Sequence, residues 1–209
     1  ASVSGGPVAT DTGVTLDAHP LLALGADSID TLLVAGGDGV FEAARDRDLL
    51  DWLRARARST RRMGATCMGA FVLGAAGFLD GRRVTTHWRW AERLRQQFPA
   101  ADVHSDAIYI DDGGLWSSAG VSAGIDLSLA MVQADLGHAT ALEVARRLVI
   151  PLKRAGGQSQ FSSALELQTA DPNGAFDRLH AWIRANLDRD LNIERLAEVY
   201  GRSTRTLDR

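Results

Sequence analysis

The single cysteine of the chain, Cys67, lies in a stretch whose spacing suits nucleophilic chemistry. The residues two before and two after it are small, Ala65 and Gly69. A nucleophile elbow, where a strand turns sharply into a helix, needs small residues there because larger side chains collide. A sulfur at a helix amino terminus favours the thiolate, which is both a nucleophile and a target of oxidation. Cys67 is therefore a candidate nucleophile or redox thiol, and the alternative is a buried structural cysteine.

Three further residues are candidates for a ligand pocket around this thiol: Met68, His87 and Asp126. His87 follows the strand-like run Val84–Thr86, where residues of a parallel sheet often contact ligands. Its imidazole could relay a proton or bind a ligand, and the alternative is a histidine hydrogen-bonded in the packed layer beside Trp88. Asp126 either belongs to the pocket or caps and orients the helix predicted around it.

The elements that must position these residues alternate between strand and helix. The apolar run Ile29–Val34, closed by two glycines, is typical of a buried parallel strand that ends in a tight turn. Asp111–Gly114 predicts a hairpin turn. We expect a flavodoxin-like, doubly wound α/β domain with a parallel sheet covered on both faces. Further strands are predicted at 63–66, 84–88, 103–105, 107–110 and 115–118, and helices at 41–58, 68–78, 89–98, 125–136 and 139–150.

The last residues, 191–209, carry the pattern of two short helices joined by a glycine. Gly201 fits the left-handed position that ends a helix, and Ser203 fits the amino cap of the next. This order is typical of a helix-turn-helix, and the alternative is any small helical hairpin. One face of the first predicted helix collects Ile193, Leu196, Ala197 and Tyr200.

Composition changes along the chain divide it into three parts. Residues 1–152 form the predicted α/β domain, and residues 153–172, which include several Gly, Gln and Ser, are a predicted linker. Residues 173–209 form a small all-α segment. Residues 1–150 carry a net charge of −4 and residues 151–209 a net charge of +1, so DNA binding cannot rest on charge alone.

Several classes of protein are excluded by composition. One cysteine rules out an internal disulfide framework and a cysteine-based zinc cluster, and it fits a reducing cytoplasm. The other histidines show no metal-ligand spacing, so we expect no metal and no cofactor. No apolar run of about 18 residues predicts a membrane span, and the first residues lack a signal-peptide pattern.

The run Cys67–Trp88 resembles the elbow and following strand of ThiJ/PfpI-like (class I glutamine amidotransferase-like) regulators. The resemblance covers roughly residues 5–165, and isonitrile hydratases resemble the same part of the chain. It implies the α/β fold already expected from the pattern, used to sense a small-molecule effector or to dimerise. Further matching segments are Asp111–Gly113, Trp116–Gly120, Ala123–Leu127, Ala145–Val149 and Gly156–Phe161.

Two departures from that family bear on chemistry. Many ThiJ/PfpI-like enzymes have histidine directly after the nucleophile, whereas this chain has Met68. The family also sets an acidic residue from an early strand–helix segment against the cysteine. Residues 1–14 resemble the second part of the family fold, so we expect that first strand and helix to be absent. No catalytic acid or base is assigned.

The carboxy-terminal segment resembles the first helix-turn-helix of AraC-type regulators. That resemblance implies a helix in the major groove, with Arg205 and Arg209 reading bases and Arg202, Ser203 and Thr204 contacting phosphate. AraC-type domains carry two such units, and the second is missing from residues 173–209. We therefore expect DNA as a partner, weak binding by the 209-residue chain, and a homodimer reading paired sites.

Three functions follow as hypotheses. The first is a transcriptional regulator, not an enzyme, with an effector-sensing or dimerising first domain. The second is a cysteine-dependent hydrolase or an isonitrile hydratase-like enzyme acting through Cys67. The third is a redox sensor in which oxidation of this thiol switches the protein.

Overall fold

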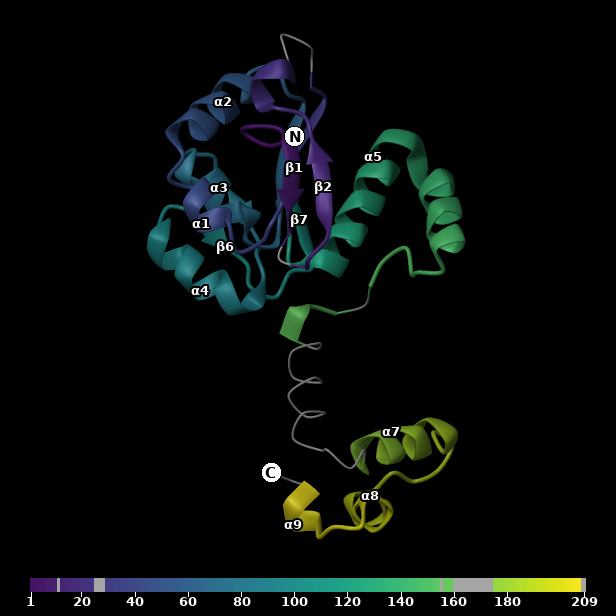
Figure 1. Ribbon diagram of the computed structural model, residues 1–209. Coiled ribbons are helices and arrows are strands. Elements are labelled where there is room, and N and C mark those ends of the chain that lie inside the picture. The colour runs from purple at the N-terminus through teal and green to yellow at the C-terminus, as the bar shows by residue number, and fades with distance from the viewer. Residues whose placement is uncertain (11, 25–28, 155, 160–174, 208–209) are drawn as a thin grey trace. The chain divides into compact units, whose positions relative to one another are not determined.

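The computed structural model describes residues 1–209 except 11, 25–28, 155, 160–174 and 208–209 (Figure 1). The chain divides into two compact units, Ala1–Gln158 and Ser159–Arg209. The first unit holds the candidate thiol, and the second holds the predicted DNA-contacting residues. The first unit therefore extends into the segment predicted as a linker.

A four-stranded sheet forms the centre of the first unit. Its order is β3 (Thr31–Val34), β4 (Arg62–Thr66), β8 (Leu115–Ser118) and β7 (Tyr109–Asp112). The first three strands are parallel, and β7 pairs antiparallel with β8. A two-residue turn at 113–114 joins these last strands, and both of its glycines have positive φ. The predicted hairpin is thus present, and the sheet is mixed but mostly parallel.

Helices cover both faces of this sheet. In Figure 1, α1 to α4 lie on one side of it and α5 lies on the other. This layering is the predicted α/β arrangement. The helices span α1 (Val40–Ala43), α2 (Arg47–Ala57), α3 (Ala70–Ala75), α4 (Trp88–Gln97) and α5 (Val121–Leu148).

The two faces of the sheet have separate cores. On β8, Leu115 belongs to the large cluster that includes Phe71, whereas the next residue, Trp116, packs with Leu127 and Met131 of α5. Successive residues of a strand point to opposite faces, so one strand supplies both cores. The elbow region lies in the larger core.

Two of the predicted helical regions contain a break, one unexpected and one predicted. The helix expected over 41–58 is broken into α1 and α2 because Asp46 caps a new helix, accepting a hydrogen bond from the Leu49 amide at 3.1 Å. In α5, Gly137 has non-helical φ 85° and ψ 168°, which confirms the predicted break there. The first of those two helices begins at Val121, earlier than predicted.

Two small sheets flank the central one. Strands β1 (Gly6–Ala9) and β2 (Thr15–Ala18) form an antiparallel hairpin, followed by the 3-10 helix η1 (Leu21–Leu24). Strand β5 (Arg83–Val84) pairs with β6 (Asp102–Val103) in parallel. The strand predicted over 84–88 is therefore wrong beyond Val84, because α4 begins at Trp88 and residues 85–87 lead into it.

The second unit contains three described helices, α7 (Ala175–Ala185), α8 (Ile193–Tyr200) and α9 (Thr204–Leu207). Gly201 ends α8 in the left-handed conformation, with φ 71° and ψ 31°. Leu179 of α7 and Ala197 of α8 are each 4% exposed, and these two helices contact each other. The predicted pair of helices meeting across Gly201 is confirmed.

An arginine–aspartate cluster ties the start of β4 to its neighbours. Arg61 reaches Asp30 and Asp135, each with a nitrogen–oxygen distance of 2.8 Å, and Arg62 also contacts Asp135. Hydrogen bonds from Arg61, foremost, lower the pKa of both carboxyls to about 2. Both carboxylates therefore favour the folded state only while they are ionised.

These lowered pKa values predict acid sensitivity of the fold. The free energy of unfolding contributed by Asp30 and Asp135 is present above their unfolded pKa of about 4 and is lost as the pH falls to about 2. Thermal melts across this window should show a steeper fall for the wild type than for Asp135→Asn. The exposed Asp17→Asn on β2 is the matched control and should keep the wild-type slope. Equal slopes for wild type and Asp135→Asn would contradict the assignment.

Candidate functional site

Cys67 lies at the turn between β4 and α3. It opens a short 3-10 helix, Cys67–Gly69, and Thr66 before it is extended, with φ −106° and ψ 140°. Its own φ is 53°, in the left-handed region that residues other than glycine rarely adopt. Such a conformation persists only where the surroundings hold it, and it is frequent at functional sites. The predicted strand-to-helix elbow is present.

Two glycines let the surrounding backbone approach the elbow. A Cβ on Gly69 would lie 2.4 Å from the carbonyl oxygen of Val34, and a Cβ on Gly36 would lie 2.7 Å from the Cβ of Cys67. Neither distance leaves room for a side chain. The small residue predicted two positions after the cysteine is therefore required by the end of the neighbouring strand β3.

A pocket of about 350 Å³ opens at this elbow. It brings together three of the predicted pocket residues, Cys67, Met68 and His87. Cys67 is half-buried, whereas Met68 is 5% exposed and belongs mainly to the large core. The full lining is Gly36, Gly37, Asp38, Thr66, Cys67, Met68, His87, Arg89, Trp90 and Val121.

His87 makes a structural contact and also lines the pocket. Its Nδ1 accepts a hydrogen bond from the Arg89 amide at 3.3 Å, which caps α4, and its ring also lines the pocket. Burial, and then the charge of Arg89, lowers the pKa of His87, so the ring is neutral at pH 7. With Nδ1 as acceptor, the neutral ring carries its proton on Nε2 and can donate a hydrogen bond.

Asp126 is a buried carboxylate of α5 that is not among the residues lining this pocket. It is 5% exposed, and its Oδ1 accepts a hydrogen bond from Arg154 Nε at 3.1 Å. Because α5 begins at Val121, Asp126 is inside the helix and cannot cap it. Its contact with Arg154 holds the segment after α5 against that helix, which is an orienting role, and a part in ligand binding stays a prediction.

Two charged pocket residues, Asp38 and Arg89, were missed in the sequence. Asp38 lies in the glycine-rich turn after β3, and Arg89 lies in the first turn of α4 with its guanidinium over the Trp88 ring, 5.7 Å from the centroid. The signal for Asp38 was its place after a parallel strand, where ligand-contacting loops gather. It supplies a carboxylate to the thiol pocket, whose lining does not include the acidic residue expected there, Asp126.

The predicted DNA-contacting residues lie in the second unit. Arg202, Ser203, Thr204 and Arg205 are exposed around the start of α9, directly after the Gly201 turn. Arg209 lies outside the described residues. The structure thus places four of the five in one short exposed stretch.

The pocket is lined by ionisable and aromatic side chains of the described residues. Within these residues, no three or more His, Cys, Asp and Glu side chains gather so as to hold a metal ion. None of the described helices is both long and apolar enough to cross a bilayer. What the pocket offers is one thiol, one neutral imidazole, a carboxylate and a guanidinium beside aromatic rings.

A protein-family model described as the DJ-1/PfpI family matches residues 1–134. The isonitrile hydratase of Pseudomonas putida is 35% identical over 137 residues, 65% of this chain and 58% of that protein. The HTH-type transcriptional regulator GlxA of Rhizobium meliloti is 31% identical over 208 residues, 98% of this chain and 62% of that protein. The HTH-type transcriptional regulator GbdR of Pseudomonas aeruginosa is 26% identical over 184 residues, which are 88% of this chain and 49% of that protein. The chain thus spans between 49% and 62% of these relatives.

Solved structures share the fold. A ThiJ/PfpI family protein from Pseudomonas syringae has a TM-score of 0.63 at 26% identity, covering 81% of this chain and 72% of that one. An AraC family transcriptional regulator from Pseudomonas putida has a TM-score of 0.59 at 28% identity, covering 70% and 78%. DJ-1beta of Drosophila melanogaster, at 21% identity and a TM-score of 0.63, shows the fold alone.

The elbow packing makes a direct prediction about Gly69. Gly69→Ala forces a methyl group against the Val34 carbonyl oxygen and should lower the free energy of unfolding by about 1–3 kcal/mol, as overpacking does. Gly39→Ala is the matched control, because a Cβ there meets nothing within 4 Å. Urea denaturation of both variants measures the difference. Equal stabilities would mean that the elbow relaxes freely.

Proposed function

This chain belongs to the DJ-1/PfpI family, and on that premise we propose that it is part of a DNA-binding transcriptional regulator. The observation that carries the proposal is the reach of the match to GlxA, which extends over 98% of this chain and so includes the second unit. That unit also has two helices joined by a left-handed glycine, the order of a helix-turn-helix.

The DNA-contacting side of the proposal concerns the exposed residues around α9. In a helix-turn-helix, the second helix enters the major groove with its first residues toward the bases. Arg205 is then the base-reading residue, and Arg202, Ser203 and Thr204 contact phosphate. Arginine suits this role because it can bridge O6 and N7 of guanine. Reading paired sites implies a homodimer.

The sensing side of the proposal concerns the Cys67 pocket. A volume of about 350 Å³ is enough for a small organic effector. Asp38 and Arg89 supply opposite charges, His87 supplies a hydrogen bond, and Trp90 supplies an apolar wall. This mixture favours recognition of a small polar molecule. The first unit would then act as the effector-binding part of the regulator.

A second candidate function is supported by the elbow itself. The left-handed Cys67 has the geometry of a nucleophile, and the isonitrile hydratase of Pseudomonas putida shares 35% identity over the same unit. In that case Cys67 would attack an electrophilic carbon of the substrate. Against it stands Met68, which fills the following position with a side chain that has no proton to give.

The DNA proposal predicts the effect of one substitution. In a chain extended by a second helix-turn-helix unit, Arg205→Ala should weaken binding to a duplex selected from a random pool by about 1–3 kcal/mol, the usual loss for a base-reading arginine. Gel-shift titration measures it, and the 209-residue chain should bind that duplex more weakly. Arg146→Ala, an exposed arginine of α5, removes the same charge as a control. Equal losses of DNA affinity in both variants would mean that Arg205 acts only through its positive charge.

Replacement of the thiol separates the two functions. We expect Cys67→Ser in the extended chain to bind the same duplex with unchanged affinity, because the thiol lies in the first unit and serves as part of a pocket. The wild-type chain should show no thiol-dependent turnover of a simple alkyl isonitrile in a spectrophotometric assay. Turnover that disappears in Cys67→Ser would establish the enzyme instead.

A further inference from the structure

Gln158, the last residue of the first unit, has a buried side chain that is fully occupied by hydrogen bonds. It is 5% exposed. Its Oε1 accepts from the Trp88 amide at 2.8 Å. Its Nε2 lies within donating distance of three oxygens, Thr85 Oγ1 at 3.1 Å, Thr86 O at 3.0 Å and Ala107 O at 2.9 Å. Because both ends of its side-chain amide are hydrogen-bonded, Gln158 restricts the movement of the groups that it contacts.

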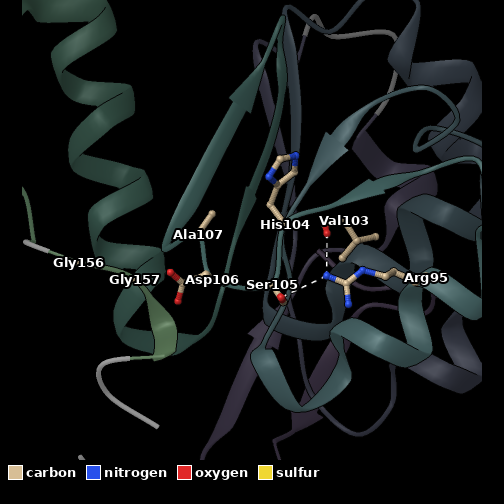
Figure 2. Close-up of a pocket in the computed structure, with 8 residues that line it drawn as sticks. All are labelled: Arg95, Val103, His104, Ser105, Asp106, Ala107, Gly156 and Gly157. Carbon is tan, nitrogen blue, oxygen red and sulfur yellow. Dashed lines mark hydrogen bonds between the residues drawn. The ribbon is translucent and has the colours of Figure 1, made fainter. Parts of the chain in front are cut away.

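The backbone leading to Gln158 is also docked closely. The Gln158 amide donates to the Asp106 carbonyl at 2.8 Å. A Cβ on Gly157 would lie 2.2 Å from Asp106 Oδ2, so a side chain at position 157 would have to displace this carboxylate. Figure 2 shows Gly156 and Gly157 beside Asp106 in a pocket that has Arg95 on its far side. Residues 156–158 are therefore seated on the loop at 104–107.

These contacts converge on the Cys67 pocket. Gln158 holds the carbonyl of Thr86 and the amide of Trp88, the residues on either side of His87. Thr86 Oγ1 in turn donates to the carbonyl of Cys67 at 2.7 Å. The His87 side chain, which lines the pocket, is thus carried on a backbone segment clamped at both ends. The Trp88 amide is one of the first amides of α4 and needs a partner outside its helix.

We propose that Gln158 is a positioning residue for the Cys67–His87 pocket. It fixes the 85–88 backbone from the segment that leads into the second unit, which begins at Ser159. A ligand that binds better when Gln158 holds the 85–88 backbone also stabilises that hold. Coupling between two binding events is reciprocal, so release of Gln158 then weakens binding of the ligand. This consequence rests on the proposed regulatory function, in which the pocket reports to the second unit. The positioning role does not.

A glutamine suits this place because one side chain must both accept and donate. A glutamate would keep the acceptor for the Trp88 amide but would lose the donor to Thr85, Thr86 and Ala107. It would also bury a carboxylate against carbonyl oxygens, which is unfavourable. Alanine removes all of these bonds and leaves the 85–88 backbone without its clamp.

The test follows the reactivity of Cys67. Carbamidomethylation by iodoacetamide, followed by mass spectrometry across the pH range, gives the rate and the apparent pKa of the thiol. Gln158→Ala should react about fivefold faster than the wild type, a change of about 1 kcal/mol in the barrier, which is the usual contribution of one hydrogen bond. Its Trp88 amide should also exchange hydrogen faster. Gln96→Ala is the matched control, an exposed glutamine of α4 whose Nε2 donates to Glu92 at 3.0 Å. It should leave both unchanged.

A second pair of variants covers the case in which Gln158→Ala does not fold. Gly157→Ala forces a methyl group against the Asp106 carboxylate without altering the Gln158 side chain and should also raise the rate of Cys67 modification. Asp106→Ala combined with Gly157→Ala removes the colliding carboxylate and should restore the wild-type rate. Wild-type reactivity in Gly157→Ala and in any folded Gln158→Ala would overturn the proposal, as would an equal increase in Gln96→Ala. The assay uses neither DNA nor effector, so its outcome is independent of the gel shifts.

Discussion

The first unit depends on one backbone constraint, the left-handed conformation of Cys67 at the end of β4. A residue with a Cβ takes φ 53° only where its neighbours leave no alternative. Here the neighbours are the end of β3 and the turn after it, which approach so closely that positions 36 and 69 must be glycine. The parallel pairing of β3 with β4 brings these segments together. The register of that pairing therefore also determines where the thiol lies.

The same constraint explains how a pocket arises from loops that are far apart in the sequence. The turn after β3 brings Asp38, the elbow brings Cys67, and the start of α4 brings His87. The turn after β3 and the elbow follow neighbouring strands of the central sheet, whereas the start of α4 follows β5 of a flanking sheet. Hydrogen bonds tie these loops together, as in the bond from Thr86 to the Cys67 carbonyl. The rigidity of the pocket therefore depends on the contacts that hold these loops. Gln158, which lies outside the loops, holds the 85–88 backbone through hydrogen bonds to the Thr86 carbonyl and the Trp88 amide.

What the sequence predicted correctly was local. Three features were recognisable from a glycine or small residue in a short stretch of sequence. They are the elbow at Cys67, the break at Gly137 and the turn at Gly201. What it missed depended on distant partners. The contact of Asp126 could not be predicted because its partner, Arg154, lies 28 residues further along the chain. Gln158 was interpreted as linker because nothing near it in the sequence shows that it reaches Trp88. Polar residues in glycine-rich segments have this ambiguity, and only the folded contacts resolve it.

The hydrogen bonding of His87 favours binding over thiol activation in this pocket. A histidine that takes a proton from a cysteine must present an unprotonated ring nitrogen to the sulfur. Here Nδ1 already accepts from the Arg89 amide, and the other nitrogen of the neutral ring carries the proton. His87 can therefore give a hydrogen bond to a ligand, but it can accept the thiol proton only by giving up the cap of α4. Asp38 is the remaining pocket group able to accept a proton, and its carboxylate equally suits a cationic or hydrogen-bonding ligand. The elbow geometry is thus combined with a polar lining, which is what the proposed effector-sensing role requires.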